Sequence, residues 1–102
     1  MAEIRQVRSV IARLVDKGVV TGRSDGKLHD LFPIAIPAHE GEALRKWVTR
    51  EDAASTIEVG LGYGISALFI CEGLVSNGHT GARHVASLVR FTMWRIIRPD
   101  CW

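Results

Sequence analysis

The sequence has 102 residues, of which 47% are hydrophobic and 24% are charged. This balance is that of a globular domain and excludes a chain that is disordered throughout. The formal net charge of +2 is too small to predict nucleic-acid binding by charge alone. Cys71 and Cys101 show no metal-ligand spacing, and together they predict a reduced, cytoplasmic protein. The apolar run over 65–75 is far shorter than the about 20 residues that cross a bilayer.

The first part of the chain predicts a helix, a turn and an extended connector. Apolar residues recur with the helical period over 4–17, and Gly18 then marks the end of the helix. Glycine and aspartate over 21–27 are typical of a turn, and two prolines make 28–37 an extended connector. The basic side chains beside the apolar stripe of the helix are expected to face water: Arg5, Arg8 and Arg13.

A second helix is predicted over 38–50, again with one apolar side. The side chains expected to face the core are Ala43, Leu44, Trp47 and Val48. Those expected to face water are Arg45, Lys46 and Arg50.

Residues 55–90 predict a strand, a glycine turn, a helix and a second strand. The strands are expected over 55–59 and 83–89, as parallel neighbours in an incomplete sheet. The helix is expected over 65–76, with Ser66 capping its first turn and Asn77-Gly78 ending it. The side chains expected to point inward from this helix are Ile65, Leu68, Phe69 and Val75.

The glycine turn carries the strongest functional signal, because Gly60, Gly62 and Gly64 follow a strand that ends with Glu58-Val59. Backbone N–H groups at the start of a helix, together with the helix dipole, favour an anionic or carboxylate-bearing ligand. The dinucleotide fingerprint needs glycine or alanine where this sequence has Ile65, and the lysine of a phosphate-binding loop is absent. Neither of those two ligand classes is therefore predicted.

The stretch 56–67, TIEVGLGYGISA, resembles motif I of the class I S-adenosylmethionine-dependent methyltransferases, in the form found in small-molecule O-methyltransferases. The resemblance extends over about 28–86 and includes the segment 39–44. It implies an α/β, Rossmann-like core, S-adenosylmethionine as cofactor and methyl transfer to a small-molecule oxygen acceptor. The turn would cradle the amino-acid end of the cofactor, with Glu58 helping to hold the ammonium. The implied cofactor-binding residues are Glu58, Gly60, Leu61, Gly62, Tyr63, Gly64, Ser66, Glu40 and Gly41.

The sequence departs from the family pattern after the second strand. The family has an acidic residue there for the ribose hydroxyls, whereas 85–88 contains no acid. Segment 91–102 resembles no family strand, and two explanations stand. One is a change of reading frame near Ser87; the other is a C-terminal helix in which Trp94, Ile97 and Trp102 cover the sheet. We expect a truncated methyltransferase with a cofactor half-site, no turnover by this chain alone and no assignable catalytic residue.

The sequence thus divides into an N-terminal helical segment 1–54, a cofactor-binding unit 55–90 and an atypical tail 91–102. A small non-catalytic interaction or nucleic-acid-binding module is the alternative function, disfavoured because the basic residues are spread along the chain. No nucleic acid, membrane or metal is expected as a partner. Open sheet edges predict self-association, with Trp94 and Trp102 in the contact. Three histidines without ligand spacing are expected on the surface or in strands: His29, His79 and His84.

Overall fold

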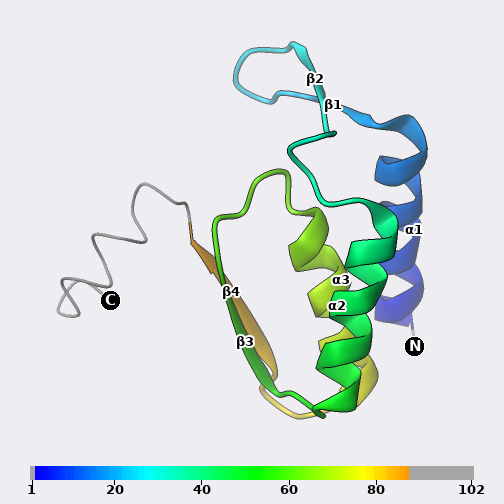
Figure 1. Ribbon diagram of the computed structural model, residues 1–102, viewed down its shortest axis with the longest axis vertical. Coiled ribbons are helices and arrows are strands. Elements are labelled where there is room, and N and C mark those ends of the chain that lie inside the picture. The colour runs from blue at the N-terminus through cyan, green and yellow to red at the C-terminus, as the bar shows by residue number, and fades with distance from the viewer. Residues whose placement is uncertain (1, 88–102) are drawn as a thin grey trace, which may run out of the picture.

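The computed structural model describes residues 2–87 of the chain, which form a mixed α/β structure (Figure 1). Two small sheets accompany three helices in this part of the chain. The helices are α1 (Ala2–Lys17), α2 (Ala38–Arg50) and α3 (Ile65–Asn77). The strands are β1 (Val19–Thr21), β2 (Leu28–Asp30), β3 (Ser55–Val59) and β4 (Arg83–Ser87). Each helix predicted within residues 2–87 is present within one or two residues of its expected bounds. Of the helices in residues 2–87, none is both long enough and apolar enough to cross a membrane.

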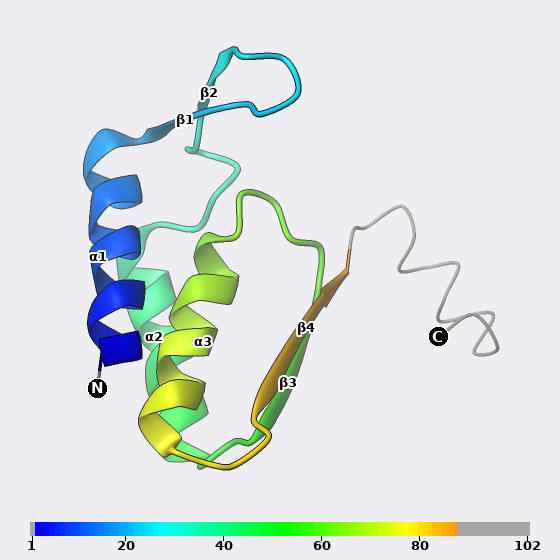
Figure 2. The ribbon, with the colours of Figure 1, turned by 180° about the vertical axis from the view of Figure 1, so that it is seen from behind.

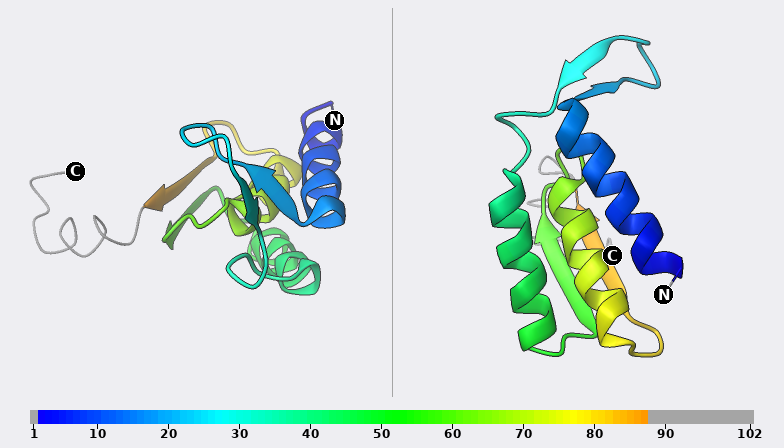
Figure 3. Two further views of the ribbon diagram at one scale, coloured as in Figure 1. Left: turned by 90° about the horizontal axis from the view of Figure 1, so that it is seen from above. Right: turned by 90° about the vertical axis from the view of Figure 1, so that its right-hand side faces the viewer.

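Helix α3 is the centre of the structure. Helices α1 and α2 both pack against it, and all three helices lie on the same side of the β3–β4 sheet (Figure 2 and Figure 3). Because α3 has neighbours on several sides, it is apolar around most of its circumference. Buried side chains from its whole length confirm this: Ile65, Phe69, Ile70 and Leu74.

Strands β3 and β4 pair in parallel, with Ser55 opposite Arg83 and Val59 opposite Ser87. The predicted βαβ connection is confirmed, with α3 between the two strands in sequence. The last residues expected in the second strand, 88–89, lie outside the described part of the chain. Side chains alternate along β3, so that Thr56 and Glu58 are half-buried, whereas Ile57 and Val59 are exposed.

Strands β1 and β2 form an antiparallel hairpin that the sequence did not predict. The expected turn is present, and Gly26 takes a φ of +66° within it. Asp25 Oδ1 accepts a hydrogen bond of 2.9 Å from the Lys27 amide and tightens the turn. Residues 28–30 are extended as expected, but their pairing with β1 was not predicted. Strands of three residues are too short to show the alternation by which strands are recognised.

The expected side-chain orientations are wrong at several helical positions. On α2, Ala43 and Trp47 are exposed, because this helix turns Val48 and the bare backbone of Gly41 towards α3. The Trp47 ring instead lies beside Arg50, whose guanidinium carbon is 5.3 Å from the ring centre. Val75 of α3 is also exposed rather than inward. Arg45, expected in water, is largely covered and lies beside the buried Glu72 of α3, whereas Arg8 is exposed as expected and also makes an ion pair with Glu72.

Hydrophobic side chains gather in two clusters on either side of α3. The first joins α1, the segment after the hairpin and the start of α3, through Ile11, Leu31, Ala35, Ile65 and Phe69. The second joins α2 to the later part of α3, through Val48, Ile70 and Leu74. The α1 stripe predicted from the sequence is confirmed, since Ile4 and Ile11 are buried.

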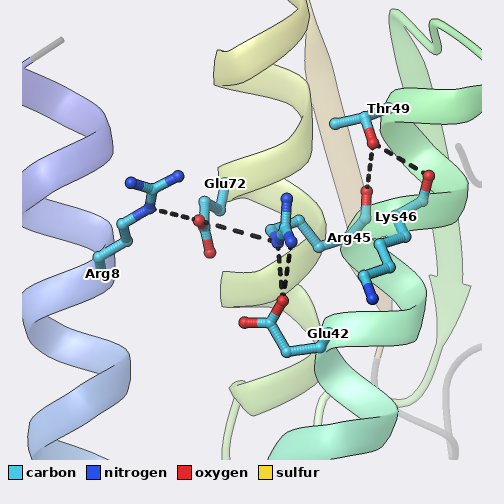
Figure 4. Close-up of polar contacts among 6 residues, drawn as sticks. All are labelled: Arg8, Glu42, Arg45, Lys46, Thr49 and Glu72. Carbon is cyan, nitrogen blue, oxygen red and sulfur yellow. Dashed lines mark hydrogen bonds and ion pairs between the residues drawn. The ribbon is translucent and has the colours of Figure 1, made fainter.

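A buried carboxylate connects the three helices. Glu72 of α3 is 4% exposed, and its Oε1 accepts a hydrogen bond from Arg8 Nε of α1 (Figure 4). Arg45 Nε of α2 lies 3.9 Å from the same oxygen, and Arg45 also donates two hydrogen bonds to Glu42. Charged partners from both neighbouring helices offset the cost of burying Glu72. The ion pairs therefore link α1 and α2 to α3.

Candidate functional site

The glycine turn lies between the C-terminal end of β3 and the start of α3. Gly60, Gly62 and Gly64 have φ values of +84°, +54° and +83°, a region that residues with a Cβ rarely adopt. Gly64 is the N-cap of α3 and makes no side-chain cap hydrogen bond. A Cβ at Gly62 would meet no atom within 4 Å, so space beside this backbone is open to a ligand. Backbone conformation, rather than crowding, thus requires glycine here.

A cavity of about 230 Å³ opens beside this turn. Its walls come from the segment before α2, the end of β3, the turn and the start of α3. Six of the residues predicted to bind cofactor line it: Glu58, Gly60, Leu61, Gly62, Tyr63 and Ser66. Gly64, Glu40 and Gly41 are not among the lining residues. Glu40 is exposed on α2, and Gly41 packs against the Phe69 ring.

The Glu58 side chain is held by partners on two other elements. Ser66 Oγ donates a hydrogen bond of 2.7 Å to Glu58 Oε2, and His84 Nε2 lies 2.9 Å from Glu58 Oε1. His84 Nδ1 lies 2.8 Å from Thr56 Oγ1 on the paired strand. An ionised carboxylate only accepts, so we assign the proton to His84 Nε2, and a neutral ring then accepts from the Thr56 hydroxyl.

This cluster corrects one expectation from the sequence and adds a contact that was not expected. Ser66 does not cap α3; its hydroxyl binds Glu58 instead. His84 does lie in a strand, but only 6% of its side chain is exposed, and sequence reasoning missed its contact with the candidate site. The register of the two strands could have indicated this contact. Thr56 and Glu58 share one side of β3, and His84 pairs with Thr56 in the parallel register.

Replacing His84 by leucine is expected to lower the free energy of unfolding by about 1–3 kcal/mol, because Glu58 and Thr56 lose a buried hydrogen-bond partner. Urea unfolding followed by circular dichroism measures the change. His39→Leu is the matched control on the exposed side of α2, where the expected change stays within about 0.5 kcal/mol. Equal effects of the two substitutions would show that the His84 contacts add nothing to stability.

Cys71 of α3 lies near this cluster but is poorly suited to nucleophilic chemistry. Burial raises the pKa of its thiol, and the negative charge of Glu58 raises that pKa further. The thiol is therefore protonated at neutral pH, whereas the thiolate is the reactive form. Among residues 2–87 there is also no group of three or more His, Cys, Asp or Glu side chains placed to hold a metal. The chemistry that the glycine-turn cavity favours is ligand binding.

Larger cavities lie elsewhere in residues 2–87. One of about 320 Å³ lies between the end of α1 and the hairpin, away from any parallel strand, and two others are larger still. Of these two, one of about 410 Å³ lies among the three helices, where Arg8 and Glu72 on its wall pair with each other and Glu42 pairs with Arg45. The other, of about 520 Å³, lies beside 78–84, at the N-terminal end of β4. Ligands of open α/β sheets bind at the carboxyl ends of the strands. The smaller cavity at the glycine turn is therefore the better candidate site.

Comparison of the chain with known protein-family models, with curated proteins and with solved structures finds no match in any of the three. The geometry of the candidate site and the motif resemblance are therefore the two features that bear on function.

Proposed function

We propose that the chain has a Rossmann-like core of the class I methyltransferase type and carries the half-site for its cofactor. In this proposal the turn 60–64 binds the amino-acid end of S-adenosylmethionine or S-adenosylhomocysteine. The observation that carries it is the position of the turn, which follows the first strand of a parallel βαβ unit and opens onto a cavity. The Glu58 carboxylate on the same wall adds a group of the right charge for an ammonium.

The donors and acceptors around the cavity suit an amino-acid group. The first N–H groups of a helix have no partner within the helix, and the dipole at that end favours a carboxylate. Glu58 has one partner on each oxygen, whereas an ionised carboxylate offers about four lone-pair sites. It therefore retains acceptor capacity for an ammonium. Because Ser66 and His84 fix the carboxylate in place, little side-chain entropy remains to be lost on binding.

The size of the cavity limits the proposal to part of the cofactor. Its volume of about 230 Å³ is below the roughly 300–1,000 Å³ typical of sites that enclose a drug-sized ligand. The adenosine would lie beyond it, towards the end of β4, where the described residues provide no carboxylate for the ribose. When bound, the cofactor supplies a sulfonium methyl group, which the family transfers to an acceptor oxygen. Residues 2–87 contribute binding and orientation, and we assign no catalytic residue among them.

Calorimetric titration of the full chain with S-adenosylhomocysteine tests the proposal. We expect weak binding, because the cavity encloses only part of the ligand, and loss of that binding in Gly62→Val. The matched control is Gly26→Val, which places the same side chain at a φ of +66° in the hairpin turn, outside the cavity. This control carries comparable backbone strain and should bind as the unchanged chain does.

A second variant separates loss of binding from loss of folding. Glu58→Gln keeps the shape of the side chain and removes its charge, so we expect binding to weaken roughly tenfold or more, as for a lost charge-assisted hydrogen bond. Circular dichroism checks that each variant is folded. Absence of any heat with the unchanged chain, or equal affinity in Gly62→Val, would overturn the proposed site.

A further inference from the structure

The outer face of the β3–β4 sheet is apolar and uncovered by residues 2–87. Ile57 and Val59 of β3 are 67% and 64% exposed, and Val85 of β4 is 43% exposed. Ile57 and Val85 are partners in the parallel register, so their side chains are neighbours on one surface. Figure 3 shows that the three helices all lie on the other side of this sheet. We call the surface formed by Ile57, Val59 and Val85 the outer apolar face.

An uncovered face of this kind is unusual for a parallel sheet. Parallel sheets occur almost only with both faces covered, because crossover connections place helices against them. Here the inward side chains of the pair include the hydrogen-bonded Thr56, Glu58 and His84, whereas the aliphatic ones point outward. Three exposed aliphatic side chains on one strand pair are expected to form a contact site for another apolar segment.

The part of the chain that follows β4 has the composition required to cover this face. We propose that segment 91–102 of the same chain docks on the outer apolar face. β4 ends at Ser87, and the sequence after it is rich in large apolar residues: Phe91, Met93, Trp94, Ile96, Ile97 and Trp102. Aromatic side chains contribute the largest buried area per residue. The segment therefore supplies the apolar surface that residues 2–87 do not.

Chain length allows this contact. Trp94 lies seven residues after Ser87, and an extended chain spans about 3.3 Å per residue, or about 23 Å over that distance. A strand of five residues is about 17 Å long, so Trp94 can reach any point on the outer apolar face.

Covalent connection also favours this occupant over a second copy of the protein. A segment tethered by a short flexible linker has an effective concentration on the order of millimolar at its binding site. A second copy at micromolar concentration is far more dilute. The same apolar surface should therefore bind the segment of its own chain first.

Tryptophan fluorescence of the full chain tests the contact. Trp47→Phe leaves Trp94 and Trp102 as the only tryptophans, and their emission should be blue-shifted and weakly quenched by acrylamide. Adding Ile57→Lys should shift the emission to the red and raise quenching. Leu28→Lys is the matched control, because Leu28 is equally exposed but lies on the hairpin. Emission typical of solvent-exposed tryptophan in the Trp47→Phe variant alone would overturn the proposal.

A second measurement leaves the outer apolar face unchanged. In Cys71→Ser, a nitroxide attached to Cys101 should broaden the amide resonances of Ile57, Val59 and Val85 more than those of α1. The broadening should persist when the labelled protein is diluted with excess unlabelled, spin-free protein whose resonances are isotopically silent. If it disappears on that dilution and sedimentation shows a dimer, a second copy occupies the face and the proposal is wrong. Equal broadening of α1 and the face would also contradict it.

Discussion

Replacing Gly41 by alanine is expected to lower the free energy of unfolding by about 1–3 kcal/mol, the usual cost of overpacking a core. A Cβ at Gly41 would lie 2.1 Å from the nearest atom of the Phe69 ring, which is itself 2% exposed. The ring therefore has no free space to enter, and α2 must move away from α3. Thermal or urea unfolding measures the loss.

The expected loss of stability is opposite to what helix propensity alone would give. Alanine favours a helix over glycine by about 1 kcal/mol, so an exposed position would be stabilised by the same substitution. Ala43→Gly, at an exposed position of the same helix, gives the size of that preference as a control. If Gly41→Ala stabilises the protein as much as Ala43→Gly destabilises it, α2 and α3 are not in close contact.

Replacing Arg8 by methionine is expected to cost about 1–3 kcal/mol, because the buried Glu72 loses its nearest cation. The loss is smaller than for a fully enclosed pair, since Arg8 is itself exposed and Arg45 remains 3.9 Å from the carboxylate. Arg5→Met, on the exposed side of the same helix, should change stability by less than about 0.5 kcal/mol. Denaturant unfolding of the two variants measures the difference.

A double substitution separates the ion pair from the arginine itself. Apolar replacements of both partners in a buried ion pair are often neutral, because no uncompensated charge remains. Arg8→Met combined with Glu72→Leu should therefore be more stable than Arg8→Met alone. An equal or larger loss in the double variant would show that Glu72 does not depend on Arg8.

The order of the helices and the parallel strand pair could be predicted because their signals are local. Gly18 ends α1 with a φ of +67°, and glycine at 60, 62 and 64 marks the reversal between β3 and α3. The same glycines indicated the turn as the candidate site, and a cavity opens beside it. Its binding role remains a prediction.

Features that depend on contacts between distant elements could not be predicted. The inward position of Arg45 is explained by Glu72 on another helix, and the burial of His84 by Glu58 on another strand. The apolar periodicity of one helix contains no information about such partners. Trp47 was expected to be buried because it is hydrophobic. It is exposed, because α2 contacts α3 through Gly41 and Val48 instead. The predictions for 88–102, including those for Trp94, Ile97 and Trp102, fall outside the described residues.

The central position of α3 has a consequence for the order of folding. The paired positions of β3 and β4 are 28 residues apart, as for Ser55 and Arg83, and α3 lies between them in the sequence. Closing a loop of that length costs entropy before any strand hydrogen bond forms, and a formed helix shortens the distance to be closed. We therefore expect α2 and α3 to associate early and the parallel strands to pair late. When α3 unfolds, α1, α2 and the parallel sheet lose the element that they all contact, so they should unfold together.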